Sequence, residues 1–146
     1  MLKTFQGRVI AAGDVTAEAV VTKNGFNTLA SMQMMFIQPK TKCVDQSNPD
    51  LYNKILGGRA LCLPQTIGST TGGMFLFSAV ESGKAPACLL FSKDIDSLAA
   101  AGAVLSDVFS KNKMPVVDRL GDEFLDFVKD GDRVSVKSDG TVQVLR

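Results

Sequence analysis

The sequence contains no histidine. Histidine is the most common general base and metal ligand near neutral pH. Its absence excludes a Ser-His-Asp triad and any histidine-based metal site built from this chain alone. Chemistry here must depend on hydroxyl, carboxylate, lysine, arginine, cysteine or backbone groups, or be completed by another chain.

Cysteine is scarce, with Cys43, Cys62 and Cys88 widely spaced and no C-x-x-C pair among them. An odd number at such spacing is untypical of a disulfide framework or a zinc site, so we expect reduced thiols. Cys62 and Cys88 lie in apolar runs, which predicts that they pack in the core. The polar loop around Cys43 favours an exposed thiol. A cluster held by the three cysteines is the alternative interpretation.

Long apolar runs and charge of one sign are also missing. No stretch approaches the roughly 20 apolar residues that span a bilayer, and residues 1–7 lack the apolar core of a signal peptide. The net charge is +1, with basic and acidic residues interleaved, so there is no basic stripe for nucleic acid. We therefore expect a soluble cytoplasmic protein that binds neither membrane nor nucleic acid, folded as a single domain over residues 1–146.

The patterns that are present alternate between strand and helix. Residues 60–63 read as a buried strand, 72–81 as a helix that ends at Gly83, and 86–91 as a second buried strand, which together predict a parallel β-α-β unit. A helix over residues 94–109, a short strand at 114–117 and a helical segment at 122–128 follow. Asp118 and Arg119, between the last two, are expected to form a loop ion pair or a helix cap.

Both ends of the chain favour antiparallel hairpins. Residues 8–13 and 15–22 read as two strands around Gly13 and Asp14. Residues 133–136 and 141–144 alternate strictly around an Asp-Gly turn. The fold class is therefore α/β, with terminal β-hairpins and central β-α units.

One segment, residues 64–73, concentrates glycines and hydroxyls between a buried strand and a helix start. Backbone amides at a helix N-terminus favour an anion, such as a substrate carboxylate. The alternative is that Ser69, Thr70 or Thr71 has no catalytic role and only caps the helix, which stabilises it by about 1 kcal/mol. The segment does not match a Walker A loop, and Thr71 occupies the last glycine position of a G-x-S-x-G elbow.

Several short motifs follow one another along almost the whole chain. They are Gly7-Arg8-Val9-Ile10, Gly57-Gly58-Arg59-Ala60-Leu61, Leu63-Pro64, Gly68-Ser69-Thr70, Gly83-Lys84-Ala85-Pro86-Ala87 and Pro115-Val116-Val117-Asp118. In order and spacing this series resembles the small subunit of the aconitase X family. The resemblance implies the swivelling β/β/α domain of the aconitase superfamily.

The resemblance also implies a function. Family members are hydro-lyases in which the small subunit closes over a larger subunit that holds an iron-sulfur cluster through its own cysteines. The cluster iron acts there as the Lewis acid on the departing hydroxyl. The family's serine base corresponds to Ser69, and Gly68, Thr70 and Thr71 correspond to the substrate loop. We thus expect no cofactor on this chain and a heterodimer or larger assembly.

The substrates implied are small hydroxy acids. Bacterial members dehydrate cis-3-hydroxy-L-proline, and archaeal members dehydrate 5-phosphomevalonate. This sequence lacks the lysine of the archaeal Gly-Gly-Lys-Gly-Ser loop, which favours hydroxyproline. The alternative hypothesis, from a different functional class, is a non-catalytic binding domain with the same swivel fold. The patch formed by Met32, Met34, Met35 and Phe36 is expected to be either part of the subunit interface or core.

Overall fold

A computed structural model describes residues 1–68 and 71–146 of the chain. Its elements in chain order are β1 (Leu2–Gln6), β2 (Arg8–Ala11), β3 (Val15–Val21), β4 (Phe26–Asn27), α1 (Thr28–Met32), the 3-10 helix η1 (Met35–Ile37), β5 (Ala60–Leu63), β6 (Thr66–Ile67), α2 (Gly72–Glu81), β7 (Cys88–Phe91), α3 (Ser97–Phe109), β8 (Val116–Asp118), α4 (Asp122–Phe127), β9 (Arg133–Val136) and β10 (Thr141–Leu145). Strands and helices alternate through the middle, as the sequence predicts.

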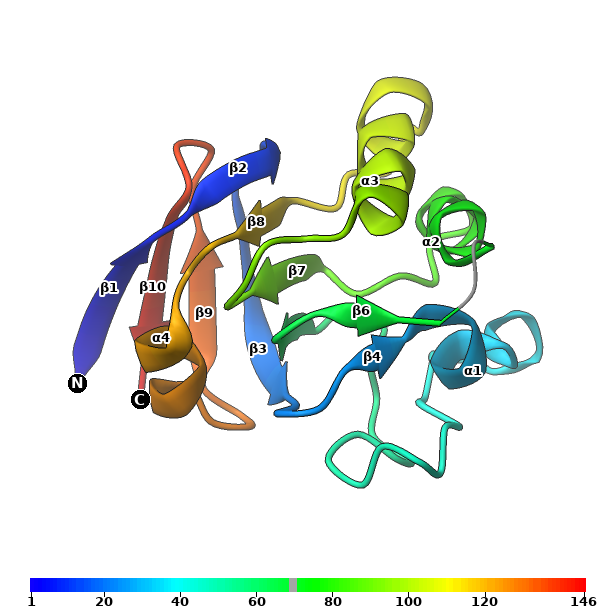
Figure 1. Ribbon diagram of the computed structural model, residues 1–146, viewed down its shortest axis with the longest axis horizontal. Helices are drawn as coiled ribbons and strands as arrows, with labels where there is room; N and C mark the ends of the chain where they lie inside the picture. Colours follow the sequence, from blue (N-terminus) through cyan, green and yellow to red (C-terminus); the bar gives the residue numbers. More distant parts are fainter. Residues whose placement is uncertain (69–70) are drawn as a thin grey trace.

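Eight of the described strands form one curved sheet in the order β1-β10-β9-β3-β5-β7-β8-β2 (Figure 1). The strands at its two ends, β1 and β2, are consecutive in sequence and are separated only by Gly7. One extended segment therefore pairs with β10 along its first half and with β8 along its second half. This segment connects the antiparallel and the parallel parts of the sheet.

The parallel part contains β3, β5, β7 and β8. The predicted β-α-β unit is β5-α2-β7, in which Ala60 pairs with Cys88 and Leu61 with Leu89. Leu61 and Leu89 belong to one apolar cluster, whereas Ala60 and Cys88 belong to another. Because both faces of these strands are buried, they read as continuous apolar runs in the sequence.

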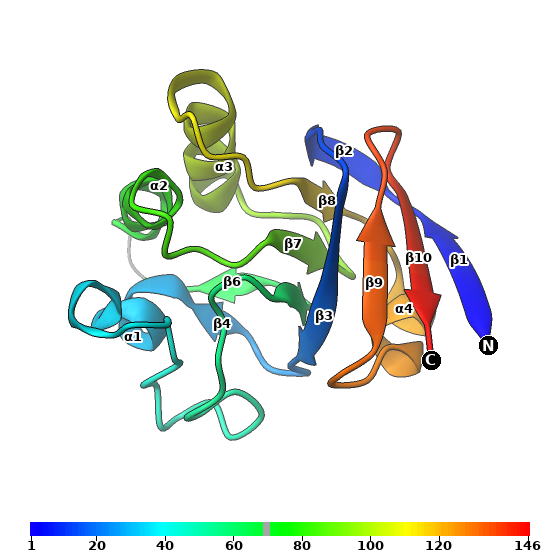
Figure 2. The ribbon, with the colours of Figure 1, turned by 180° about the vertical axis from the view of Figure 1, so that it is seen from behind.

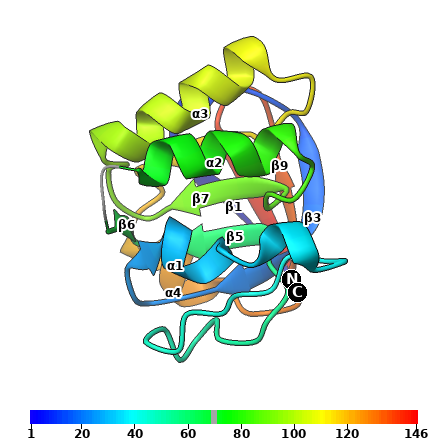
Figure 3. The same ribbon diagram turned by 90° about the vertical axis from the view of Figure 1, so that its right-hand side faces the viewer.

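The two apolar clusters separate three layers. Helices α1, α2 and α3 lie side by side over one face of the parallel strands (Figure 3). The antiparallel strands β9, β10 and β1 lie on the opposite side of the molecule (Figure 2). The cluster that contains Leu61 also contains side chains of α2 and α3, and the other cluster joins the parallel strands to β9, β10 and α4. This β/β/α layering is the one that the family resemblance implies.

Helix α2 ends as predicted. The amide of Gly83 donates to the carbonyl of Val80 at 3.1 Å, and the amide of Lys84 donates to that of Ala79 at 2.9 Å. This pair of bonds is a Schellman motif, with Gly83 at a φ of 74°. The glycine therefore fixes the point at which the chain leaves the helix and turns toward β7.

The C-terminal hairpin is also confirmed, because β9 and β10 are antiparallel neighbours. The two ends of the chain meet beside it. The Met1 ammonium donates to the carbonyl of Arg146 at 2.8 Å, and the Arg146 amide donates to the carbonyl of Met1 at 3.0 Å. In the described residues, no helix has the length and apolar character required to span a bilayer.

The predicted N-terminal hairpin is wrong, although both of its strands are present. β2 pairs with β8, while β3 lies between β9 and β5. Both edges of β3 are thus occupied by other strands. The turn residue Asp14 instead accepts two hydrogen bonds from Ser138, at the tip of the β9-β10 hairpin. The turn between β2 and β3 therefore carries the chain between two parts of the sheet.

Two expectations for individual side chains need correction. Cys43 is fully buried, because the loop folds back on itself: the Cys43 amide donates to the Lys54 carbonyl, and the thiol side packs in the helix-side cluster. Asp118 and Arg119 form neither a mutual ion pair nor a cap. Asp118 binds Arg8 through two hydrogen bonds of 2.9 and 2.6 Å, and Arg119 binds Asp94.

The methionine patch is core for half of its residues, as one of the two interpretations predicts. Met32 and Met35 are fully buried in the core. Met34 and Phe36 are exposed, and Ile37 after them is also exposed. Met32 of α1 and Met35 of η1 thus belong to the core, whereas the exposed side chains beside them form an apolar surface.

Candidate functional site

A hollow of about 210 Å³ lies where the first turns of α2 and α3 meet β6. It is lined by Thr28, Thr66, Ile67, Gly68, Gly72, Gly73, Asp96, Leu98 and Ala99. The segments that follow the parallel strands β5 and β7 lead into this hollow. Ligands of parallel α/β sheets bind at this edge, beyond the carboxyl ends of the strands.

Most of the loop that the sequence singles out borders this hollow. Gly68, Gly72 and Gly73 line it, and Thr71 is the exposed N-cap residue of α2. The Thr71 side chain makes no capping hydrogen bond to the helix. Ser69 and Thr70, the predicted base and its neighbour, lie outside the described residues.

The strand that leads to the loop is fixed by β4. Phe26 pairs with Thr66 and Asn27 with Ile67 in a parallel ladder, and the Phe26 amide donates to the Gln65 carbonyl at 2.9 Å. Gly68 then adopts a φ of 113°, a conformation that residues with a side chain rarely adopt. A Cβ atom at Gly68 would lie 2.9 Å from the Asn27 Nδ2 atom. The position therefore requires glycine on two grounds.

Asp96 connects the same strand to α3. One of its carboxylate oxygens accepts hydrogen bonds from the Leu98 and Ala99 amides, at 3.1 and 3.0 Å, and so caps the helix. The other oxygen accepts a hydrogen bond from the Thr66 hydroxyl. Asp96 is thus a site residue that the sequence analysis missed. Its signal was an aspartate directly before a helical run, which is typical of an N-cap.

Asn27 is the second residue that was missed. Its Oδ1 atom accepts a hydrogen bond from the Ala30 amide at 3.0 Å and caps α1, while its amide nitrogen faces Gly68. Nothing in the local pattern connects Asn27 with a glycine 41 positions later. Only the β4-β6 ladder brings the two together.

The electrostatics of the hollow follow from these contacts. Among the described residues that line the hollow, Asp96 is the only charged one. The first turn of α2 carries no acidic side chain, so the positive end of the helix dipole is not neutralised there. Ile67 and Leu98, at 53% and 43% exposure, give the rim an apolar character. The hollow suits a small molecule with a carboxylate near α2.

The three cysteines are not placed to hold a metal cluster together, which was the alternative interpretation of the sequence. Cys62 and Cys88 pack in the cluster beside the antiparallel strands, whereas Cys43 packs on the helix side of the sheet. Burial raises the pKa of the Cys88 thiol to about 12 and that of the Cys62 thiol well above its usual value. In the described part of the chain, no three histidine, cysteine or acidic side chains gather to hold a metal ion.

Comparisons with known proteins agree with this architecture. The aconitase X swivel domain model matches residues 4–144. A phosphomevalonate dehydratase small subunit from Methanocella arvoryzae is 31% identical over 141 residues, covering 97% of this chain and 96% of its own. A cis-3-hydroxy-L-proline dehydratase from Pseudomonas aeruginosa is 27% identical over 118 residues, covering 80% of this chain and 19% of its own.

Structural comparison gives the same fold. A crystal structure of Thermococcus kodakaraensis aconitase X in its holo form superimposes with a TM-score of 0.83, at 24% identity, and covers 99% of each chain. The two chains thus share one fold over almost their whole length. Since the family match extends over nearly all of the sequence, the chain belongs to the aconitase X swivel domain family.

Proposed function

We propose that this chain is the small subunit of an aconitase X-type dehydratase that removes water from a small hydroxy acid. The family match over residues 4–144 carries the proposal. Relatives that match 97% of this chain are named as small subunits, which supports a larger partner. The hollow between α2 and α3 is open to solvent on its own, so a partner that covers it would complete the site.

In this proposal Ser69 is the base. It removes the proton α to the substrate carboxylate, a carbon-carbon double bond forms, and the β-hydroxyl leaves as hydroxide with its bonding electrons. The hydroxide and the proton taken up by Ser69 together make up the water that is lost. Gly68 and Gly72, which flank the segment, both line the hollow. A serine acts as a base only if its alkoxide is stabilised, and the unneutralised N-terminus of α2 supplies part of that field.

Gly68, Thr70 and Thr71 are proposed to hold the substrate carboxylate. Backbone amides at the start of α2 favour an anion at this place. Asp96 is proposed to position the loop rather than to act on the substrate, since both of its oxygens already accept hydrogen bonds from the chain.

The leading substrate is cis-3-hydroxy-L-proline. The described lining of the hollow contains one carboxylate and no cationic side chain, which suits an amino acid better than a phosphate ester. The Pseudomonas aeruginosa relative named for this substrate supports the choice. The second candidate is 5-phosphomevalonate, favoured by the names of the archaeal small subunits.

The larger partner is proposed to hold the iron-sulfur cluster and to dock on the apolar rim of the hollow. Leu98 lines the hollow, and Val104, Val108 and Phe109 continue along the outer side of α3 with exposures of 47%, 65% and 70%. An apolar helix face of this kind is typical of a protein interface. It extends from the site itself, as a covering subunit requires.

The test is to co-express the chain with a large aconitase X subunit and to assay the complex with both substrates. Ser69→Ala should assemble normally and lower kcat by about 10² or more, because a proton acceptor is lost. Thr70→Ala removes the neighbouring hydroxyl and should raise KM, through the lost contact with the substrate carboxylate, while lowering kcat less than Ser69→Ala does. The opposite order of the two kcat values would assign the base to Thr70. Full activity in the Ser69→Ala complex would refute the serine base. A large subunit that is active alone and does not bind this chain would favour a non-catalytic binding domain.

A further inference from the structure

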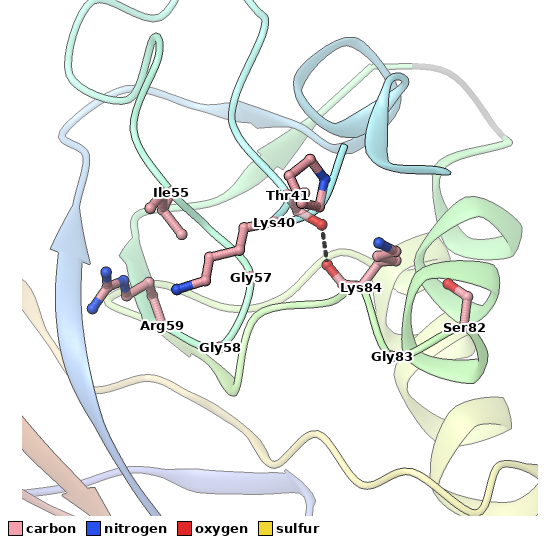
Figure 4. A pocket seen from close by; sticks show the side chains of 10 residues that line it. Lys40, Thr41, Ile55, Gly57, Gly58, Arg59, Ser82, Gly83 and Lys84 are labelled. Carbon is pink, nitrogen blue, oxygen red and sulfur yellow. Dashed lines mark hydrogen bonds between the residues drawn. The ribbon is translucent and has the colours of Figure 1, made fainter. Parts of the chain in front are cut away.

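A second hollow, of about 580 Å³, lies at the other end of α2 (Figure 4). One wall is formed by residues 82–84, which follow the helix, and another by Arg59, directly before β5. The first turn of α2 borders the candidate site. A ten-residue helix is about 15 Å long, so the two hollows are separate.

Every charged side chain that lines this second hollow is a cation. These are Lys40, Arg59 and Lys84, and the described residues that line the hollow include no aspartate or glutamate. The whole chain has a net charge of only +1, with both signs interleaved along the sequence. Positive charge is therefore concentrated here by the fold.

The three cations differ in how far they are neutralised. The Arg59 guanidinium contacts the Glu18 carboxylate, and the Lys84 ammonium donates to the Gln38 carbonyl at 2.8 Å. The Lys40 ammonium forms no hydrogen bond or ion pair with any residue that the structure describes. Its side chain extends toward Arg59 in Figure 4. Of the three cations, Lys40 is thus the one whose charged group has no partner in the described part of the chain.

The walls are held by hydrogen bonds that do not use these charges. The buried Thr41 hydroxyl donates to the Lys84 carbonyl at 2.6 Å (Figure 4). The Gly57 amide donates to the Thr41 carbonyl, and the Gly58 amide to the Ala85 carbonyl, both at 3.2 Å. The floor at Gly57 and Gly58 carries no side chains. The hollow is therefore formed before any ligand arrives, which lowers the entropy lost on binding.

We propose that this hollow binds a small anion that carries a phosphate group. Lys40, Arg59 and Lys84 line the same hollow, and their ammonium and guanidinium groups provide the charge and the donors that a phosphate accepts. The volume leaves room for the rest of a phosphorylated metabolite. A neighbouring hollow has three cations, Arg59, Lys42 and Lys54, but also two carboxylates, Glu18 and Asp130, so most of its positive charge is neutralised. The site is independent of the proposed dehydratase activity.

The proposal is tested by amide NMR of the isotope-labelled full chain, titrated with inorganic phosphate and, separately, with chloride at equal ionic strength. Phosphate should shift the amide signals of Gly57, Gly58 and Lys84 along a saturable curve. Lys40→Gln should weaken the binding about tenfold, the usual effect of losing one charged hydrogen bond. Lys111→Gln removes an exposed lysine elsewhere and should leave the binding unchanged.

Three results would overturn the proposal. The first is a shift that does not saturate or that chloride reproduces, which is the behaviour of general ionic screening. The second is equal affinity for phosphate in the Lys40→Gln and Lys111→Gln variants. The third is a response confined to Gly72 and Gly73, which would place the anion at the other end of α2. None of these readouts depends on dehydratase activity, so the two proposals are tested separately.

Discussion

Gly73 and Gly102 allow the backbones of α2 and α3 to touch. A Cβ atom at Gly73 would lie 2.3 Å from the Leu98 carbonyl oxygen, and one at Gly102 would lie 2.3 Å from the Gly73 carbonyl oxygen. Both obstacles are backbone atoms, which cannot rotate away. Gly73→Ala must therefore push the helices apart by roughly 1 Å, the gap between 2.3 Å and an ordinary contact.

The expected loss of stability follows from two opposing effects. Overpacking of this kind destabilises a protein by about 1–3 kcal/mol. Alanine is more favourable than glycine within a helix by up to about 1 kcal/mol. The net decrease in the free energy of unfolding is therefore about 1–2 kcal/mol, or roughly 3–8 °C in Tm for a chain of this length.

Gly72→Ala is the matched control, because a Cβ atom at Gly72 would meet nothing within 4 Å. It should leave the stability unchanged or raise it by up to about 1 kcal/mol. Urea and thermal unfolding followed by circular dichroism measure both variants. Gly102→Ala should resemble Gly73→Ala, and the double variant should lose less than the sum, because one outward movement relieves both contacts. Equal stability of Gly73→Ala and Gly72→Ala would refute the close helix contact.

Two further predictions concern titratable groups. All three thiols are free and buried. A thiol-specific disulfide reagent should therefore modify none of them in the native protein and all three in denaturant. Rapid labelling of the native protein would contradict the burial. The Lys23 amide, with Thr22 and Asn24, holds the pKa of Asp50 below its usual 3.8. The Asp50 carboxylate therefore stabilises the fold above pH 3.8, and this stabilisation is lost as the pH falls through the pKa of the folded state. Asp50→Asn should therefore lose less stability than the unaltered protein between roughly pH 5 and 2, as measured by urea unfolding, and equal losses would refute the assignment.

The sequence predicts the local elements of the fold well. The strand at 60–63 and the helix at 72–81 match β5 and α2 residue for residue, because their apolar runs and the glycine after the helix are local features. The pairing of β2 and β3 could not be predicted in this way. Alternation shows that a segment is a strand, but the partners of β3 lie about 40 and 115 residues away along the chain, so that they depend on the whole topology.

In the candidate site, too, the local features were predicted and the long-range contacts were not. The glycine-rich loop was predicted from its composition and its place before a helix, and its described glycines line the hollow. Asn27 and Asp96 were not predicted, because each acts on a residue that is distant in sequence and close only after folding. The burial of Cys43 was missed for a related reason. Its polar neighbours indicate a loop, but not that the loop folds back over the core.

The contact between the two chain ends has a consequence for how the polypeptide can be rearranged. Met1 and Arg146 exchange hydrogen bonds beside the β1-β10 pair (Figure 1). A short peptide could therefore join them without displacing either strand. New ends could then be opened in the exposed loop at residues 46–47, which lies outside every strand and helix. Such a circular permutant would keep all the strand neighbours of the sheet while reversing the order in which its two halves leave the ribosome.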